Sequence, residues 1–395
     1  MKITEAEARC FLPYEAVPVP FAERGALSGM TLAVKDLFDV EGYPTGAGNP
    51  KLAETGGIRR KTAEAVRRLL AAGARFVGKT VTDELAFSIA GRNAHYGSPL
   101  NGSAPERLTG GSSSGSASAV SCGLADLGLG TDTGGSIRCP ASQCGLWGIR
   151  PTHGRGSLEG CRPLAPSFDT CGLLARSAAD LEKGAAALYG PDERTGPAAP
   201  RFIIAQDAWE LADPETSRAL TGKILASGIP LEAAEIAPEG FEGHAEAFRR
   251  LQAAEAWRSC GRDIEELNLE LGPGVRERFL FGKAMASTDL SDSLAVRDKV
   301  ASRLRSLLGE DGILVFPTMP GPAPLRTAPE SEIDGFRARA FKVLSLGSLS
   351  GLPWVSVPAA KAGGAPVGLS FMGPEGRDLW VLAEAAKLAR SFGAA

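Results

Sequence analysis

The chain has 395 residues, 44% of them hydrophobic and 49 of them glycine, and its formal net charge at pH 7 is −3. These values are typical of a globular enzyme with many turns, and the lysines and arginines do not form the basic patch of a nucleic-acid-binding protein. The N-terminal residues lack an apolar segment, so we expect no signal peptide, and no apolar run reaches the roughly 18 residues of a membrane span.

The first half of the chain alternates predicted strands with predicted helices. Apolar alternation predicts a strand over Thr31–Lys35, and the next pattern predicts a helix over Lys61–Ala72 with Thr62 as its cap. We then expect a strand over Phe76–Thr80 and a helix from Thr82 onward. A second helix over about 112–122 and a strand over about 125–130 follow. This βαβ alternation favours an α/β fold with a large mixed, mainly parallel sheet covered by helices on both faces.

The second half continues the pattern after a surface linker predicted at Pro191–Pro197. Four further strands and two long helices are expected there: 202–205, 313–316, 354–358 and 367–372, and 245–257 and 290–308. Length alone suggests two or three domains, although large α/β enzymes often form one unit.

Two glycine-serine turns carry the groups that acyl transfer needs. The first turn spans 110–115 and reads GGSSSG, and the second spans 132–138 and reads DTGGSIR. Glycine lets the backbone approach a ligand closely, and consecutive N–H groups in such a turn form a nest for a developing oxyanion. Each turn also presents a serine hydroxyl, so the pair indicates a nucleophile, a proton carrier and an oxyanion hole.

A serine nucleophile needs a base, which is usually histidine, and lysine is the other known partner for serine. Of the three histidines, His153 lies in a turn predicted after a strand, and His95 and His244 have no acidic residue at a suggestive motif spacing. Lys35 ends the first predicted strand, where it is either a solvated residue or a buried base with a lowered pKa. A free lysine has a pKa near ~10.4, and bringing it to ~7 costs roughly 4.6 kcal/mol, which full burial supplies. If Lys35 is the base, we expect it to be largely buried and neutral in the active enzyme.

The stretch from Thr109 to Arg150, together with the Val34-Lys35-Asp36 block, resembles the amidase signature family of Ser-cisSer-Lys amidohydrolases. Carried over residue by residue, the resemblance implies a Ser-Ser-Lys triad of Lys35, Ser112 and Ser136. The separation of the two serines is 24 residues (136 − 112), which agrees with the layout of the family. The implied roles are nucleophile for Ser136, proton relay for Ser112 and base for Lys35.

The same resemblance assigns the residues around the nucleophile. The implied oxyanion hole consists of backbone N–H groups of Thr133, Gly134 and Gly135, with that of Ser136 itself. Asp132 and Arg138 are implied to hold the loop. Neither metal nor organic cofactor is required by this chemistry, and the spacing of the seven cysteines gives no zinc site. Most of the cysteines are expected to be buried thiols in a reducing compartment, so we expect a cytoplasmic protein.

The resemblance is strong over about 27–180 and patchy afterwards, and it is closest to short amidases related to plant indoleacetamide hydrolases. It implies one domain over 1–395, in which the second half, about 200–395, completes the sheet and the substrate pocket. The implied substrate is a small aryl or alkyl carboxamide, with no nucleic-acid or membrane partner. A homodimer is the general expectation for a soluble enzyme. Thr109 and Ser114 stand where the family usually has proline and glycine.

Alternatives remain open at this point. The chain resembles, at shorter length, the glutaminase subunit of tRNA-dependent amidotransferases, and a carbamate or ester hydrolase would use the same triad. A catalytically silent binding protein on this fold is a further alternative. The segment Gly111–Gly115 also fits the G-x-S-x-G elbow of α/β-hydrolases with Ser113 as nucleophile. That pattern needs a preceding strand, whereas Asn101–Thr109 is typical of a loop.

Overall fold

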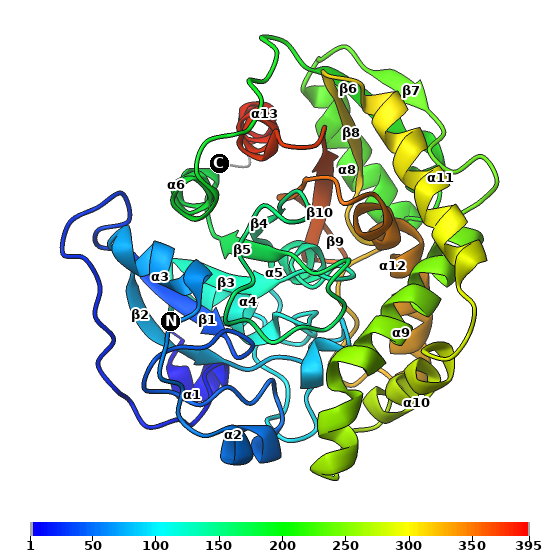
Figure 1. The fold of residues 1–395 in the computed structure, drawn as a ribbon. Helices are drawn as coiled ribbons and strands as arrows, with labels where there is room; N and C mark the ends of the chain where they lie inside the picture. The colour runs from blue at the N-terminus through cyan, green and yellow to red at the C-terminus, as the bar shows by residue number, and fades with distance from the viewer. Residues whose placement is uncertain (1–2, 394–395) are drawn as a thin grey trace.

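The computed structural model describes residues 3–393. Ten strands form one sheet: β1 Thr31–Lys35, β2 Arg75–Thr80, β3 Leu127–Thr131, β4 Trp147–Arg150, β5 Cys171–Ala175, β6 Arg201–Ala205, β7 Glu232–Ala234, β8 Gly312–Pro317, β9 Trp354–Ala362 and β10 Ala365–Met372. Their order in the sheet is β2-β1-β3-β5-β4-β9-β10-β8-β6-β7 (Figure 1). Strands from both halves of the chain therefore share the sheet, because β4 pairs with β9.

The predicted α/β class with a large mixed sheet is confirmed, but antiparallel pairing is more frequent than the sequence suggested. Five of the nine neighbouring pairs are antiparallel, and only the pairs at the two ends of the sheet are parallel. The difference arises at the centre, where β5, β4 and the β9–β10 hairpin are all antiparallel to their neighbours.

Thirteen α-helices are present among the described residues: α1 Glu5–Ala8, α2 Pro50–Gly56, α3 Glu64–Ala71, α4 Ser114–Ser121, α5 Arg138–Cys144, α6 Ala178–Tyr189, α7 Gln206–Trp209, α8 Pro214–Ala226, α9 Glu242–Glu266, α10 Val275–Met285, α11 Ser291–Leu308, α12 Glu330–Ser350 and α13 Asp378–Ser391. Two predicted helix starts are wrong. The Thr62 hydroxyl accepts the N–H of Glu41 instead of capping α3, and the segment after Thr82 forms only a short 3₁₀ turn, Glu84–Ala86.

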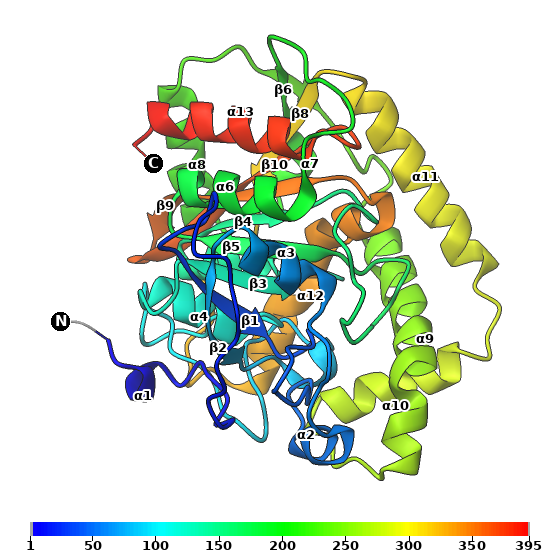
Figure 2. The ribbon, with the colours of Figure 1, turned by 60° about the vertical axis from the view of Figure 1, so that its left-hand side comes forward.

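Helices cover both faces of the sheet, as Figures 1 and 2 show. Strand alternation sorts the core: Leu32 and Val34 of β1 join one apolar cluster, and Ala33 between them joins another. The first cluster lies under α3, α6, α8 and α13, and the second lies under α4 and α5.

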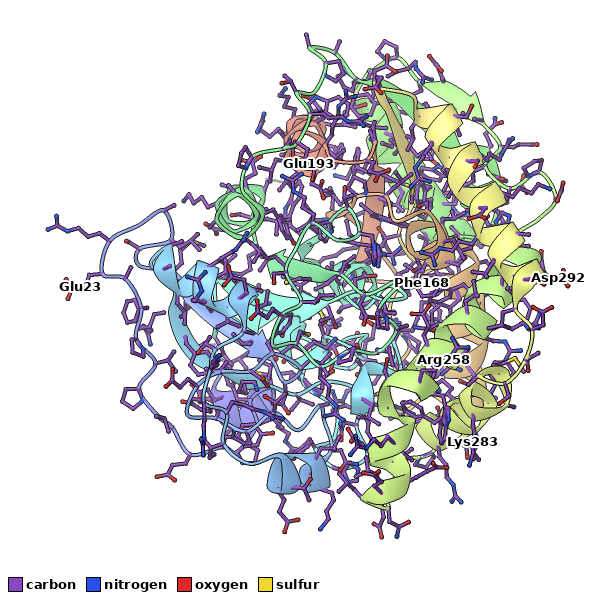
Figure 3. All side chains as sticks on the ribbon, viewed as in Figure 1. Glu23, Phe168, Glu193, Arg258, Lys283 and Asp292 are labelled. Atoms are coloured by element: carbon purple, nitrogen blue, oxygen red, sulfur yellow. The ribbon has the colours of Figure 1, made fainter. Side chains whose placement is uncertain are left out.

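A further layer of α9, α10, α11 and α12 packs beside the α4–α5 face over its own apolar cluster. Phe168 lies within this cluster, whereas Arg258, Lys283 and Asp292 on α9, α10 and α11 point outward (Figure 3). Within residues 3–393, none of the helices combines the length and the apolar character needed to cross a membrane.

Candidate active site

Lys35 lies at the end of β1 and is fully buried. Its Nζ donates to Ser112 Oγ at 2.7 Å and to Thr131 Oγ1 at 2.8 Å. Burial lowers the pKa of Lys35 to about 8, although nearby negative charges, Asp83 foremost, oppose the shift. The expected burial is thus found, but at a pKa of 8 only about one lysine in ten is neutral at pH 7, and the neutral form predominates above pH 8.

Ser112 is held in place by the segment that follows β2. Its carbonyl accepts the N–H of Asp83 at 3.1 Å and the hydroxyl of Thr82 at 2.9 Å. The Gly111–Ser112 peptide is cis, and the Asp83 carboxylate packs against Gly111. A Cβ at Gly111 would lie 2.4 Å and 2.5 Å from the two carboxylate oxygens, so only glycine fits beside Asp83.

Ser136 lies in the loop between β3 and α5, and a buried ion cluster holds this loop. The Asp132 carboxylate accepts the N–H of Gly135 at 2.9 Å and two bonds from the Arg138 guanidinium at 2.7 Å and 3.0 Å. Arg150 Nη1 adds a third contact at 3.0 Å. Burial alone would raise the pKa of Asp132, but the two guanidinium groups outweigh it and hold that pKa below its ordinary value.

The side chains of Lys35 and Ser112 are in direct contact. Ser136 is joined to this pair by a backbone hydrogen bond to the residue after Ser112. The Ser113 N–H donates to the Ser136 carbonyl at 3.3 Å. Among the described residues no hydrogen bond is found for Ser136 Oγ, which faces the large cavity that Ser136 and Gly134 line.

The predicted oxyanion donors differ in their availability. The Gly135 N–H is engaged by Asp132, so it serves the loop in this structure. Within residues 3–393 the N–H groups of Thr133, Gly134 and Ser136 have no acceptor. Buried N–H groups without a protein partner are rare, and they suit a loop that binds an oxyanion.

Three residues of the site were missed by sequence reasoning. Thr131, the last residue of β3, accepts from Lys35, and Arg150 completes the ion cluster with Asp132. Asp83 lies against the first serine turn. Thr131 and Arg150 lie within the stretch that carries the resemblance, so that stretch could have identified them. Nothing in the sequence linked Asp83 to Gly111.

Among the described residues, the side chains of the three histidines and of Ser113 form no hydrogen bond with the side chains of Lys35, Ser112 or Ser136. His95 contacts Glu84 at 2.9 Å, the His153 ring lies 3.0 Å from the carbonyl of Pro166, and His244 lies on α9. Ser113, the nucleophile of the esterase alternative, is buried and donates to the Thr131 carbonyl at 3.3 Å.

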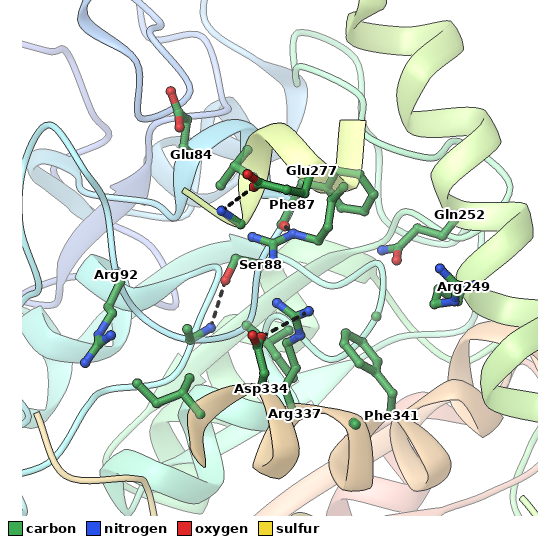
Figure 4. Close-up of a pocket in the computed structure, with 18 of the residues that line it drawn as sticks. Glu84, Phe87, Ser88, Arg92, Arg249, Gln252, Glu277, Asp334, Arg337 and Phe341 are labelled. Carbon is green, nitrogen blue, oxygen red and sulfur yellow. Dashed lines mark hydrogen bonds and ion pairs between the residues drawn. The ribbon is translucent and has the colours of Figure 1, made fainter. Parts of the chain in front are cut away.

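The cavity at Ser136 has a volume of about 1430 Å³ and is walled by one face each of α9, α10 and α12 (Figure 4). On α12 the lining residues Ile333, Arg337 and Phe341 recur every fourth position, as expected for one helix face. Phe248 of α9 and Phe341 pack beside the oxyanion loop: a Cβ at Gly134 would lie 2.7 Å and 3.1 Å from their rings. Their ring centroids are 5.8 Å apart.

Comparisons with known proteins show the family to which the chain is similar. A family model described as Amidase matches residues 15–223. "Amidase 1" of Arabidopsis thaliana is 36% identical over 90% of this chain and 92% of its own. "Indoleacetamide hydrolase" of Pseudomonas syringae pv. syringae is 32% identical over 90% of this chain and 84% of its own. A solved structure described as "Crystal structure of amidase" superposes with a TM-score of 0.84 at 36% identity, covering 94% of this chain and 86% of the other.

Proposed function

Because the chain belongs to the amidase signature family, we propose that it hydrolyses a small aryl or alkyl carboxamide to a carboxylate and ammonia or an amine. The observation that carries the proposal is the buried contact of 2.7 Å between Lys35 Nζ and Ser112 Oγ, beside a cavity into which Ser136 faces. The chemistry of this triad needs no cofactor.

Acylation begins with neutral Lys35. In that state the Ser112 hydroxyl donates its proton to Nζ, and Ser112 Oγ can take the proton of Ser136. Ser136 Oγ attacks the amide carbon, and the relay returns a proton to the leaving nitrogen, so the C–N bond breaks and an acyl-Ser136 ester forms. A water molecule then attacks the ester through the same relay, giving the carboxylate and free Ser136.

The negative oxygen of each tetrahedral intermediate needs donors that are already in place. We assign this role to the N–H groups of Thr133, Gly134 and Ser136, because they have no other acceptor among the described residues. Gly135 shapes the turn, and Asp132 with Arg138 fixes it. Removing one such donor costs about 10²–10³ in kcat in a well-studied protease.

Aromatic acyl groups are favoured by the wall beside the nucleophile. Phe248 and Phe341 place aromatic rings next to Gly134, and offset or edge-to-face pairing of aromatic rings is worth ~0.5–1.5 kcal/mol beyond burial. The relative named indoleacetamide hydrolase supports an aryl amide in the same way. A cytoplasmic location and a homodimer stay predictions for this chain.

The test is ammonia release from a panel of primary amides that includes indole-3-acetamide and glutamine. Lys35→Ala and Ser136→Ala should abolish release, and Ser113→Ala is the matched control that should keep it. Release that survives Lys35→Ala would contradict the triad, and loss in Ser113→Ala alone would favour the esterase-type nucleophile. Glutamine as the only good substrate would favour the glutaminase alternative. Silence on the whole panel, with cleavage of esters or carbamates, would favour that chemistry on the same triad.

A further inference from the structure

The large cavity contains cationic side chains that differ in how they are neutralised. Its basic lining residues are Arg92, Arg249, Arg278, Arg326, Arg337 and Lys342. Three of them form close ion pairs with carboxylates: Arg92 with Glu330 at 2.9 Å, Arg249 with Glu246 at 2.7 Å, and Lys342 with Glu242 at 2.6 Å. Arg326 donates to two backbone carbonyls, those of Pro99 and Ser98, at 2.8 Å and 3.0 Å.

Arg278 of α10 has no such partner. Its Nε donates to the carbonyl of Phe87 at 2.6 Å, and its two Nη groups have no acceptor within residues 3–393. The side chain is half-buried, and its guanidinium lies 6.0 Å from the ring centroid of Phe87. A guanidinium carries five N–H donors, so Arg278 faces the cavity with most of its donors unused.

Arg337 of α12 stands in the same cavity with only a loose partner. Its Nη2 lies 3.4 Å from Asp334 Oδ1, a carboxylate that is itself about half exposed at 52% (Figure 4). Burial and the neighbouring Arg337 guanidinium lower the pKa of Arg278 to about 10, opposed by Asp83, Asp334 and Glu277. Arg278 remains a cation at neutral pH, so two like charges, one on α10 and one on α12, line the same cavity.

We infer that Arg278 and Arg337 form an anion subsite and that the preferred substrates are amides that carry a carboxylate. This inference rests on the proposed function and names its substrate class. Guanidinium groups match the planar fork of a carboxylate, and a bound anion would relieve the repulsion between the two cations. The cavity has room for this second group, because about 1430 Å³ exceeds the roughly 300–1,000 Å³ of typical ligand pockets.

The carboxylate can come from either side of the scissile bond. In the monoamide of a dicarboxylic acid it belongs to the acyl part, and in an N-acyl amino acid it belongs to the leaving amine. Both present the same anion to the subsite, so the experiment has one arm for each. Each arm compares the free acid with its methyl ester, which keeps the shape of the substrate and removes its charge.

The measurement is kcat/KM for each acid and its methyl ester with the wild type, Arg278→Gln, Arg337→Gln and Arg249→Gln. We expect the wild type to prefer the acid at least tenfold in one arm, and that arm identifies the source of the carboxylate. Either subsite variant should lower kcat/KM of the acid about tenfold or more, mainly through KM, and change the ester less than twofold. Arg249→Gln is the matched control, because Glu246 already occupies that guanidinium in the same cavity.

Equal rates for acid and ester in both arms of the wild type would overturn the inference while leaving the amidase intact. The anion subsite is equally contradicted if the preference for the acid survives both subsite variants, or if it falls by the same factor in Arg249→Gln. If the wild type cleaves none of these amides, the result contradicts the proposed function and not the anion subsite alone. If a glutamine variant fails to fold, Arg278→Lys keeps the charge without the fork, and the acid preference should still drop several-fold.

Discussion

The pH dependence of kcat/KM should report the titration of Lys35. Only the neutral amine can take the proton of Ser112, so activity should rise with pH through the pKa of about 8 that burial gives this lysine. With that pKa the neutral fraction grows from about 0.09 at pH 7 to about 0.91 at pH 9, a tenfold gain followed by a plateau. A solvent-exposed lysine with a pKa near ~10.4 would gain about 100-fold over the same interval and reach no plateau.

The assay is kcat/KM for one neutral amide measured from pH 6 to pH 10. Asp83 is the strongest of the negative charges that raise the pKa of Lys35, so Asp83→Asn should move the rising limb to lower pH. A displacement of one unit would raise kcat/KM at pH 7 about fivefold. Glu266→Gln, a change at an exposed carboxylate, is the control and should leave the limb in place. A limb that rises without a plateau to pH 10 would refute the buried base.

Three further changes test the architecture of the site by denaturant unfolding. Asp132→Asn leaves two buried guanidinium groups without their carboxylate and should cost ~3–5 kcal/mol; a loss below ~1 would contradict the ion cluster. Gly111→Ala places a Cβ 2.4 Å from an Asp83 oxygen and should cost ~1–3 kcal/mol, so unchanged stability would refute this packing. Lys35→Met should raise the free energy of unfolding by up to ~3 kcal/mol at pH 7. The reason is that the lysine of the wild type has a higher pKa in the unfolded chain, ~10.4, than in the folded protein, about 8, so its proton favours unfolding. This gain in stability should disappear as the pH rises from 8 to about 10.4.

Much of the candidate site was predictable because its parts are local in the sequence. The strand over Thr31–Lys35 has the predicted bounds, and each serine stands in a turn whose glycines mark it. Gly110 and Gly135 have φ of 67° and 115°, a backbone region that other residues rarely adopt. A short motif can therefore identify the turn without knowledge of the rest of the fold.

The long-range pairings were not predictable in the same way. Period-2 alternation identifies a strand but not the direction of its neighbour, so the antiparallel pairing at the centre of the sheet was not predicted. Strand β5 was not among the predicted strands. The packing of Asp83 on Gly111 joins two loops, and neither one shows the contact in its own sequence.

The cavity walls show the same limit. Helix α12 contains both polar and apolar residues. Arg337 faces a cavity and not open solvent because α9 and α10 lie on the other side of that cavity. Propensity and periodicity describe one element at a time, so they do not reveal a cavity that forms between several helices and loops.

The triad residues all come from residues 35–136, whereas α9, α10 and α12, which wall the cavity, span 242–350. The proposed triad and most of the cavity wall thus come from separate stretches of the chain, although residues 84–98 of the first stretch also line the cavity. The turns of the first stretch tolerate few substitutions, since even a methyl group at Gly111 would collide with the Asp83 carboxylate. The helices of the second stretch present side chains to the cavity, so a substituted side chain there would contact the substrate and not the packed core. Exchanging those helical faces should therefore redirect the enzyme to other amides while its proton relay keeps the same titration.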